Sequence, residues 1–199
     1  MKYQPGDIGL LSYDGRWKGW KDFFPWAVKR GIIILAGWPH HVVMVLEGAD
    51  YWRDVKVGEF GHSMGAHTGG GGSPKSLAVY RPLNLTDRQI RCMIGLWQKW
   101  EAQGIPYATS RLFAHALDWP LSLGHALPWR PVTRLLKGGH DLGRECSNGV
   151  AAVTWRCAKK DFGVHHESAT PGQIWDFVRT LKHHICVRER GYYKGVRED

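Results

Sequence analysis

A cysteine at position 146 stands where a polar loop gives way to a helix-forming run. From Ser147 to about Lys160 the residues favour a helix, with apolar side chains recurring at helical spacing. Cys146 would begin that helix. There, free backbone N–H groups and the positive end of the helix dipole stabilise a thiolate, the form of cysteine that attacks carbon centres. This segment alone fits a cysteine packed in a core slightly better, so the rest of the chain has to supply the partners of a nucleophile.

A histidine in front of an apolar run is the candidate base. His41 precedes residues 42–46, which are all apolar and show no alternation. Such a run predicts a strand that is buried on both faces and central to its sheet. Residues 47–50 have turn chemistry, so residues 51–60 are predicted to return as an antiparallel partner strand. His41 would then stand at the mouth of the central strand.

A carboxylate on the partner strand is the candidate third catalytic residue. Alternation places Glu59 on the same face as two valines, the side that we assign to the core. A hairpin that closes near residues 48–51 brings the end of this strand beside His41. An equally weighted interpretation leaves Glu59 at a strand end in solvent, with His62 and His67 as substitutes for the third role.

The run at residues 61–74 contains two further motifs. Its first five residues fit the G-x-S-x-G elbow of serine hydrolases, which makes Ser63 a rival nucleophile, but no helix-forming sequence follows it. Residues 69–75 resemble a phosphate-binding loop but lack the G-K-[ST] ending. Because four glycines stand in a row at residues 69–72, the whole run is predicted to be a flexible loop.

Histidines and a cysteine late in the chain could supply metal ligands. They lack a recognised ligand spacing, so we predict neither a metal site nor a cofactor. These residues are His165, His166, His183, His184 and Cys186.

The other predicted elements are short strands and capped helices. Strands are predicted at residues 7–12 and 77–80, and helices at about 24–30, 86–103, 107–117 and 170–181. Capping boxes at Thr86 and Thr170 fix the starts of two amphipathic helices. The pattern predicts an α+β fold, a small antiparallel sheet packed against helices, with the nucleophile at a helix N-terminus.

One domain accounts for most of the chain. A length of 199 residues and a hydrophobic content of 43% suit a single core, which we assign to residues 1–187. Residues 118–140 are rich in proline and tryptophan and are predicted to be an irregular insertion that shapes a site. Residues 188–199 are highly charged without apolar periodicity and are predicted to be a disordered tail.

Charge and cysteine usage bound the surroundings. A net charge of +9 suggests an anionic surface such as a membrane or cell-wall polymer, while the scattered lysines and arginines predict no specific nucleic acid. The tryptophan-rich run at residues 17–26 could rest on a membrane, line a groove or pack in the core. The four cysteines lack any C-x-x-C pair, so reduced thiols are expected. Without a signal-like start or a long apolar run, a soluble cytoplasmic protein is expected.

The order of the motifs resembles that of a known family. Gly6-Asp7-Ile8 opens a strand, Pro39-His40-His41-Val42-Val43 carries the base, and Arg144-Glu145-Cys146-Ser147-Asn148-Gly149-Val150 carries the nucleophile late in the chain. This arrangement resembles the circularly permuted papain-like cysteine hydrolases of the YiiX type, relatives of NlpC-type cell-wall peptidases and of lecithin retinol acyltransferase. The resemblance covers most of residues 5–182 and implies a permuted papain-like fold.

Three positions depart from the family pattern. His40 stands where a serine is common, Asn148 where an acidic residue is usual, and Glu145 where an aromatic residue is usual. The departures touch substrate contacts more than the Cys/His pair, and leave the substrate open.

Together these observations predict a thiol hydrolase with Cys146 as nucleophile, His41 as base and Glu59 as the residue that orients the base. A thioacyl intermediate would form and pass to water, or to another acceptor in an acyltransferase. The expected substrate is a peptide, an amide, or a lipid acyl ester or thioester. The competing interpretation is a noncatalytic module on the same scaffold that binds a membrane or nucleic acid through its basic, tryptophan-rich surface.

Overall fold

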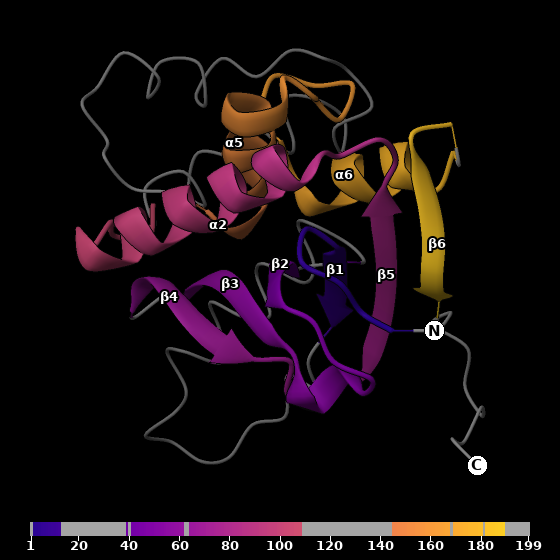
Figure 1. Cartoon of the computed structure of the whole chain (residues 1–199), viewed down its shortest axis with the longest axis horizontal. Coiled ribbons are helices and arrows are strands. Elements are labelled where there is room, and N and C mark those ends of the chain that lie inside the picture. The colour runs from indigo at the N-terminus through magenta and orange to yellow at the C-terminus, as the bar shows by residue number, and fades with distance from the viewer. Residues whose placement is uncertain are drawn as a thin grey trace, which may run out of the picture.

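The computed structural model describes residues 2–12, 39, 41–61, 64–108, 145–167, 169–180 and 182–189. Within them the chain forms a six-stranded antiparallel sheet with three α-helices packed against it (Figure 1), which confirms the predicted α+β class. The strands are β1 (Ile8–Ser12), β2 (His41–Glu47), β3 (Lys56–Gly61), β4 (Gly65–Gly70), β5 (Ser76–Pro82) and β6 (His184–Glu189). The helices are α2 (Asp87–Ala102), α5 (Cys146–Ala158) and α6 (Pro171–Val178). The strand order across the sheet is β4-β3-β2-β1-β5-β6.

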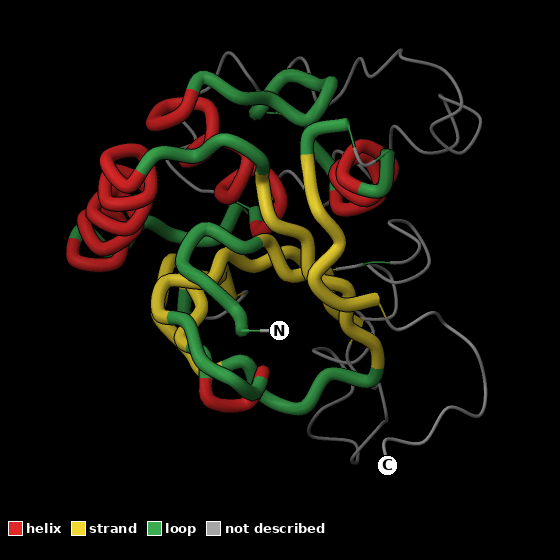
Figure 2. The backbone as a smooth tube through the Cα atoms, turned by 45° about the vertical axis from the view of Figure 1, so that its right-hand side comes forward, coloured by secondary structure: helices red, strands yellow, loops and turns green. Residues whose placement is uncertain are grey.

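Strand β2 lies inside the sheet, between β3 and β1, as the uninterrupted apolar run predicted. Residues 42–45 have no exposed surface. One face of the sheet packs against all three helices, with Met44 in the same core cluster as Trp97 of α2, Val150 of α5 and Ile174 of α6. Figure 2 shows these helices gathered along one side of the strands.

The other face of the sheet carries a second, smaller core. Val43, Val45 and Val57 belong to it, together with Tyr3 and Trp52. Because side chains alternate along a strand, Glu59 shares the face of Val57. The prediction that Glu59 and its neighbouring valines point to a core is therefore confirmed, but this core is not the one beneath the helices.

Side-chain caps fix the starts of two helices as predicted. Thr86 and Gln89 form a capping box at α2, and Thr170 and Gln173 form one at α6. Each threonine hydroxyl accepts from a backbone N–H that has no partner within its helix. The predicted helix after Cys146 is also present, and it ends at Lys159 in the left-handed conformation.

The partner strand is shorter than predicted. Residues 51–60 were expected to be extended, but Trp52–Asp54 form a 3-10 helix and β3 begins at Lys56. The turn lets Trp52 bury its ring, which is 5% exposed, against Tyr3, while its indole N–H donates to the carbonyl oxygen of Gly71. Burial of a large aromatic side chain outweighs the local preference for an extended chain.

The prediction that residues 61–74 form a flexible loop was wrong, because β4 lies within this run. All six residues of β4 pair with β3, from Gly65 opposite Gly61 to Gly70 opposite Lys56. A Cβ added at Gly65 would lie 2.3 Å from the carbonyl oxygen of Ile105. Glycine here permits close approach of backbones rather than disorder.

Strand β6 was not predicted from the sequence. It pairs with β5 at the sheet edge and runs to Glu189, so it includes the first two residues of the segment assigned to the charged tail. The predicted apolar stripe of α6 is present at Ile174 and Val178, which are fully buried.

Several sequence predictions fall outside the described residues. They are the helix at residues 24–30, the tryptophan-rich run at 17–26, residues 109–117 of the predicted short helix, the insertion at 118–140, His62, Ser63, Leu181 and the end of the chain from residue 190. Across the part that the structure does describe, no helix has the length and apolarity needed to cross a membrane.

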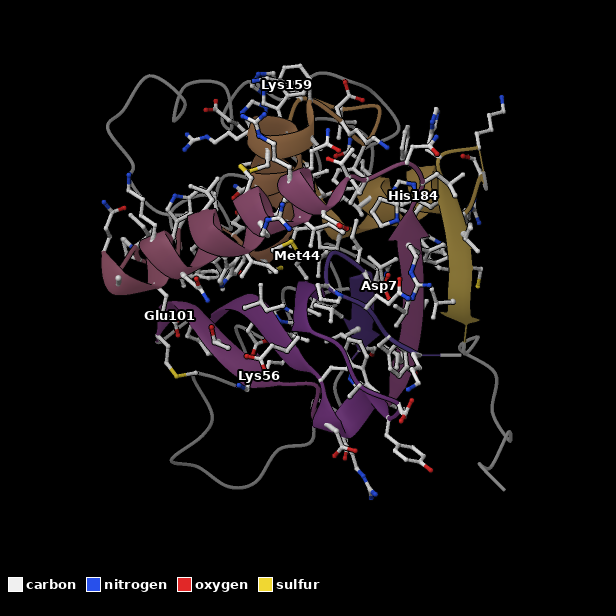
Figure 3. The ribbon with its side chains drawn as sticks, viewed as in Figure 1. Asp7, Met44, Lys56, Glu101, Lys159 and His184 are labelled. Atoms are coloured by element: carbon white, nitrogen blue, oxygen red, sulfur yellow. A yellow bond between two sulfur atoms is a disulfide. The ribbon has the colours of Figure 1, made fainter. Side chains whose placement is uncertain are left out.

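A disulfide contradicts the expectation of reduced thiols. Cys92 of α2 is bonded to Cys157 of α5, which joins the two helices (Figure 3). The spacing of the cysteines along the chain gave no sign of this pair because 65 residues separate them. Cys146 carries a free thiol.

Candidate functional site

The three residues predicted to do chemistry come from three different elements. His41 is the first residue of β2, Glu59 lies in β3, and Cys146 is the first residue of α5. The β2–β3 register, with Met44 opposite Gly58, puts Glu59 diagonally across from His41 on one face. His41 Nε2 lies 2.6 Å from Glu59 Oε2, as the predicted hairpin required.

Cys146 completes the chain of contacts on the other side of the imidazole. Its side chain is hydrogen-bonded to His41 and its residue surface is 5% exposed. Nε2 of the same ring lies against Glu59. The imidazole therefore contacts both the cysteine side chain and the carboxylate.

The surroundings of His41 favour its protonated form. Burial alone would lower the pKa of His41, but negative charge on Cys146 and a hydrogen bond to that residue, with the bond and charge of Glu59, raise it to about 10. The His41 side chain is 17% exposed, so these interactions are only partly screened by water. The site therefore stabilises the imidazolium form of His41.

Glu59 remains ionised despite its own burial. Burial acts to raise the pKa of this carboxyl group, but hydrogen bonds and charge from His41 and His67 lower it below its ordinary value. An ionised Glu59 can only accept hydrogen bonds, so it fixes the proton of His41 on Nε2.

A second histidine contacts the same carboxylate. His67 lies in β4 directly opposite Glu59, and its Nε2 is 3.1 Å from Glu59 Oε1. Glu59 therefore lies between the two histidines, with His41 at one carboxylate oxygen and His67 at the other. In the sequence, His67 was only an alternative to Glu59, because the glycine-rich run hid the strand that positions it.

Two more residues near the sulfur were missed by the sequence analysis. Burial, followed by the negative charges of Cys146 and Glu145, raises the pKa of Tyr107, so this phenol lies close to both groups and stays protonated. Glu145 precedes α5 and is 4% exposed, and its backbone N–H donates to Asn148 Oδ1 at 2.9 Å. The spacing of Tyr107 and Cys146 in the sequence does not predict that they are neighbours, because only the folding of the chain brings them together.

The first turn of α5 lies inside the protein. Ser147 and Asn148 are each 1% exposed, and Val150 is fully buried. Gly149 packs against Phe60 of β3, because a Cβ added there would lie 2.4 Å from the ring. Glycine thus lets the helix that carries Cys146 approach the strand that carries Glu59.

His184, one of the histidines weighed as metal ligands, occupies a structural position. The ring of His184 stacks on Phe162, with centroids 5.9 Å apart. Burial, then the charges of His183 and Lys160, lower the pKa of His184 to about 4. Within the described residues, no three histidine, cysteine or acidic side chains are grouped to hold a metal ion.

Comparison of the chain with protein-family models, curated proteins and solved structures finds no match.

Proposed function

We propose that the protein is a thiol hydrolase that acts through a thioacyl intermediate on Cys146, in a permuted papain-like arrangement. The observation that supports this proposal is the line of hydrogen bonds from Cys146 to His41 to Glu59, with Cys146 at the start of a 13-residue helix. Each contact answers a chemical need, because a cysteine nucleophile needs a base, and the base needs a group that fixes its tautomer.

The first half of the reaction forms the acyl enzyme. A lone pair of the Cys146 thiolate attacks the carbonyl carbon, and the electrons of the C=O bond move onto oxygen. The backbone N–H of Cys146, at the positive end of α5, donates to that oxyanion. As the carbonyl re-forms, the leaving nitrogen, oxygen or sulfur takes the proton from His41 Nδ1 and departs, leaving a thioester on Cys146.

The second half regenerates the thiolate. His41, now neutral, accepts a proton from water as the hydroxide oxygen bonds to the thioester carbon. The C–S bond then breaks, the acid product leaves, and the thiolate again faces an imidazolium. Another acceptor in place of water would make the same site an acyltransferase.

The substrate class follows from this chemistry. A site of this kind cleaves the bond between the carbonyl carbon and the leaving atom of a peptide, amide, ester or thioester, and the proposed acyl groups carry a lipid chain or belong to an anionic cell-wall polymer. The Cys92–Cys157 disulfide favours an oxidising compartment over the cytoplasm that the sequence suggested. We therefore include an oxidising site of action in the proposal.

The test uses an alkyne-tagged activated thioester as acyl probe, with the labelled residue mapped by mass spectrometry. We expect rapid acylation of Cys146 in the parent protein and none in Cys146→Ala. Cys186→Ala is the matched control, because it removes a thiol outside the site and should leave labelling unchanged. Labelling that survives Cys146→Ala, or that is lost only in Ser63→Ala, would transfer the nucleophile to another residue.

A further inference from the structure

The carboxylate of Glu59 is shared between two imidazoles. His41 Nε2 lies 2.6 Å from Oε2, and His67 Nε2 lies 3.1 Å from Oε1. The His67 ring is 18% exposed, like the carboxylate it contacts. The proposed mechanism uses the first contact and gives no role to the second.

The His67 ring has a hydrogen-bond acceptor at each nitrogen. Its Nδ1 lies 3.1 Å from the backbone carbonyl oxygen of Gly65, while its Nε2 faces Glu59. An ionised carboxylate can only accept, so the contact at Nε2 is an N–H of His67 that donates to Glu59. The ring therefore supplies a hydrogen-bond donor on the far side of Glu59 from His41.

The local backbone holds the His67 ring in place. Thr68 donates to Glu101 of α2 through its backbone N–H and its hydroxyl, both at 2.7 Å. On the other side, the N–H of Ala66 donates to the carbonyl oxygen of Ile105 at 2.9 Å. Figure 3 shows Glu101 at the end of α2 near β4. Hydrogen bonds from the residues on both sides of His67 thus fix the position of β4.

Two glycines provide the space for this cluster. A Cβ at Gly61 would lie 2.8 Å from His67 Cε1, and a Cβ at Gly69 would lie 3.0 Å from Glu59 Oε1. Both distances are too short for an ordinary side-chain contact. Gly61 of β3 and Gly69 of β4 therefore leave room for the paired imidazole of His67 and carboxylate of Glu59.

We propose that His67 is a positioning residue that acts through Glu59, holding the carboxylate ionised and turned toward His41. The inference rests on the proposed thiol hydrolase function. Among the described residues, His41 from β2 and His67 from β4 are the titratable groups that face Glu59. Cys146 of α5 contacts His41, and Tyr107 and Glu145 lie near Cys146. Glu101 of α2 binds Thr68. The lowered pKa of Glu59, with His67 among its causes, agrees with this role.

Two variants test the hydrogen bond that His67 makes to Glu59. His67→Phe keeps a ring of similar size but has no donor, whereas His67→Gln keeps a donor. We expect His67→Phe to slow acylation of Cys146 by the thioester probe roughly tenfold at neutral pH, the scale for loss of an outer hydrogen-bond partner. The acid limb of the rate should move to higher pH in this variant, because loss of the donor raises the pKa of Glu59, and His67→Gln should recover most of the parent rate.

A double-mutant cycle tests whether His67 works through Glu59. In a Glu59→Gln background, His67→Phe should cause no further loss, because its partner is already neutral. His183→Gln, which changes an exposed histidine outside the cluster, is the control and should leave rate and pH profile unchanged. Additive losses, or an unmoved acid limb in His67→Phe with its folded structure intact by circular dichroism, would overturn the inference.

One readout needs no enzyme activity. The ¹³C carboxyl resonance of Glu59 should titrate at higher pH in His67→Phe than in the parent protein. If this shift occurs but Cys146 is never acylated, the hydrolase proposal fails and the role of His67 in holding Glu59 stands. If Cys146 is acylated and the Glu59 titration does not move, the hydrolase proposal stands and the inference about His67 fails.

Discussion

At the scale of single residues, His41 is the group on which the site depends. It is hydrogen-bonded to both Glu59 and Cys146, so removal of its proton weakens two favourable interactions. Its pKa in the folded protein is about 10, against about 6.5 in an unfolded chain. This raised pKa contributes stability that is present below about pH 6.5 and is lost as pH rises toward 10.

The protonation of His41 can be followed directly by ¹⁵N NMR of labelled histidine. We expect its ring to titrate near pH 10 in the parent protein. The midpoint should fall in Glu59→Gln, and fall further in Cys146→Ala, because the charge and hydrogen bond of Cys146 are the larger of the influences that raise it. A His41 midpoint that is unchanged in both variants would show that neither acidic group contacts it in solution.

At the scale of elements, the packing of α5 on β3 decides where the sulfur lies. Gly149, three residues after Cys146, lies directly against the ring of Phe60, and Phe60 follows Glu59 in β3. The same ring packs edge-on against Trp97 of α2, with centroids 5.2 Å apart. The aromatic cluster therefore sets the distance between the helix that carries Cys146 and the strand that carries Glu59.

Gly149→Ala should destabilise the protein although alanine favours a helix. The gain in helix propensity is about 0.5–1 kcal/mol, whereas forcing a methyl group into a packed core costs about 1–3 kcal/mol. We expect a net loss of about 1–2 kcal/mol in the free energy of unfolding, measured by denaturation in urea.

The matched control is Gly95→Ala in α2, where a Cβ would meet nothing within 4 Å. This change should stabilise the protein by up to about 1 kcal/mol. Equal effects of the two substitutions would mean that α5 does not pack closely on β3.

The elements also show how far the sequence could predict this structure. Local signals were sufficient where one interaction determines the element, as in the capping boxes of α2 and α6 and the apolar run of β2. Cys146, His41 and Glu59 could be proposed because each lies at a recognisable place on such an element.

Long-range contacts account for the failures. The 3-10 helix at Trp52–Asp54 forms because a tryptophan finds a pocket made by distant residues, and β4 forms because glycines approach Ile105 and Glu59. No local pattern encodes those neighbours. For the same reason, the sequence did not predict where His67 and Tyr107 lie in the site.

At the scale of the whole molecule, a covalent link joins two of the helices that cover the sheet. The Cys92–Cys157 disulfide connects α2, which is tied to β4 through Glu101, with α5, which carries Cys146. Closing a loop of this length stabilises the folded state by about 4 kcal/mol in the chain-entropy account.

Replacing both cysteines, Cys92→Ala with Cys157→Ala, should therefore lower the melting temperature by roughly 10 °C. The measurement is differential scanning calorimetry with and without dithiothreitol. The reductant should lower the melting temperature of the parent protein and leave that of the double variant unchanged. Cys186→Ala is the control and should melt like the parent. Free thiols at both positions in the oxidised protein, detected by mass spectrometry after alkylation, would contradict the link.

The position of Cys146 in the chain has a consequence for biosynthesis. Strands β1 to β5 and helix α2, with His41 and Glu59, all precede α5 in the sequence. A ribosome adds about 5–20 residues per second, so this part of the protein emerges several seconds before Cys146 does. Under the proposed mechanism, the nascent chain therefore carries no thiolate beside His41 while β1 to β5 are being made, and acyl chemistry would begin only when α5 docks.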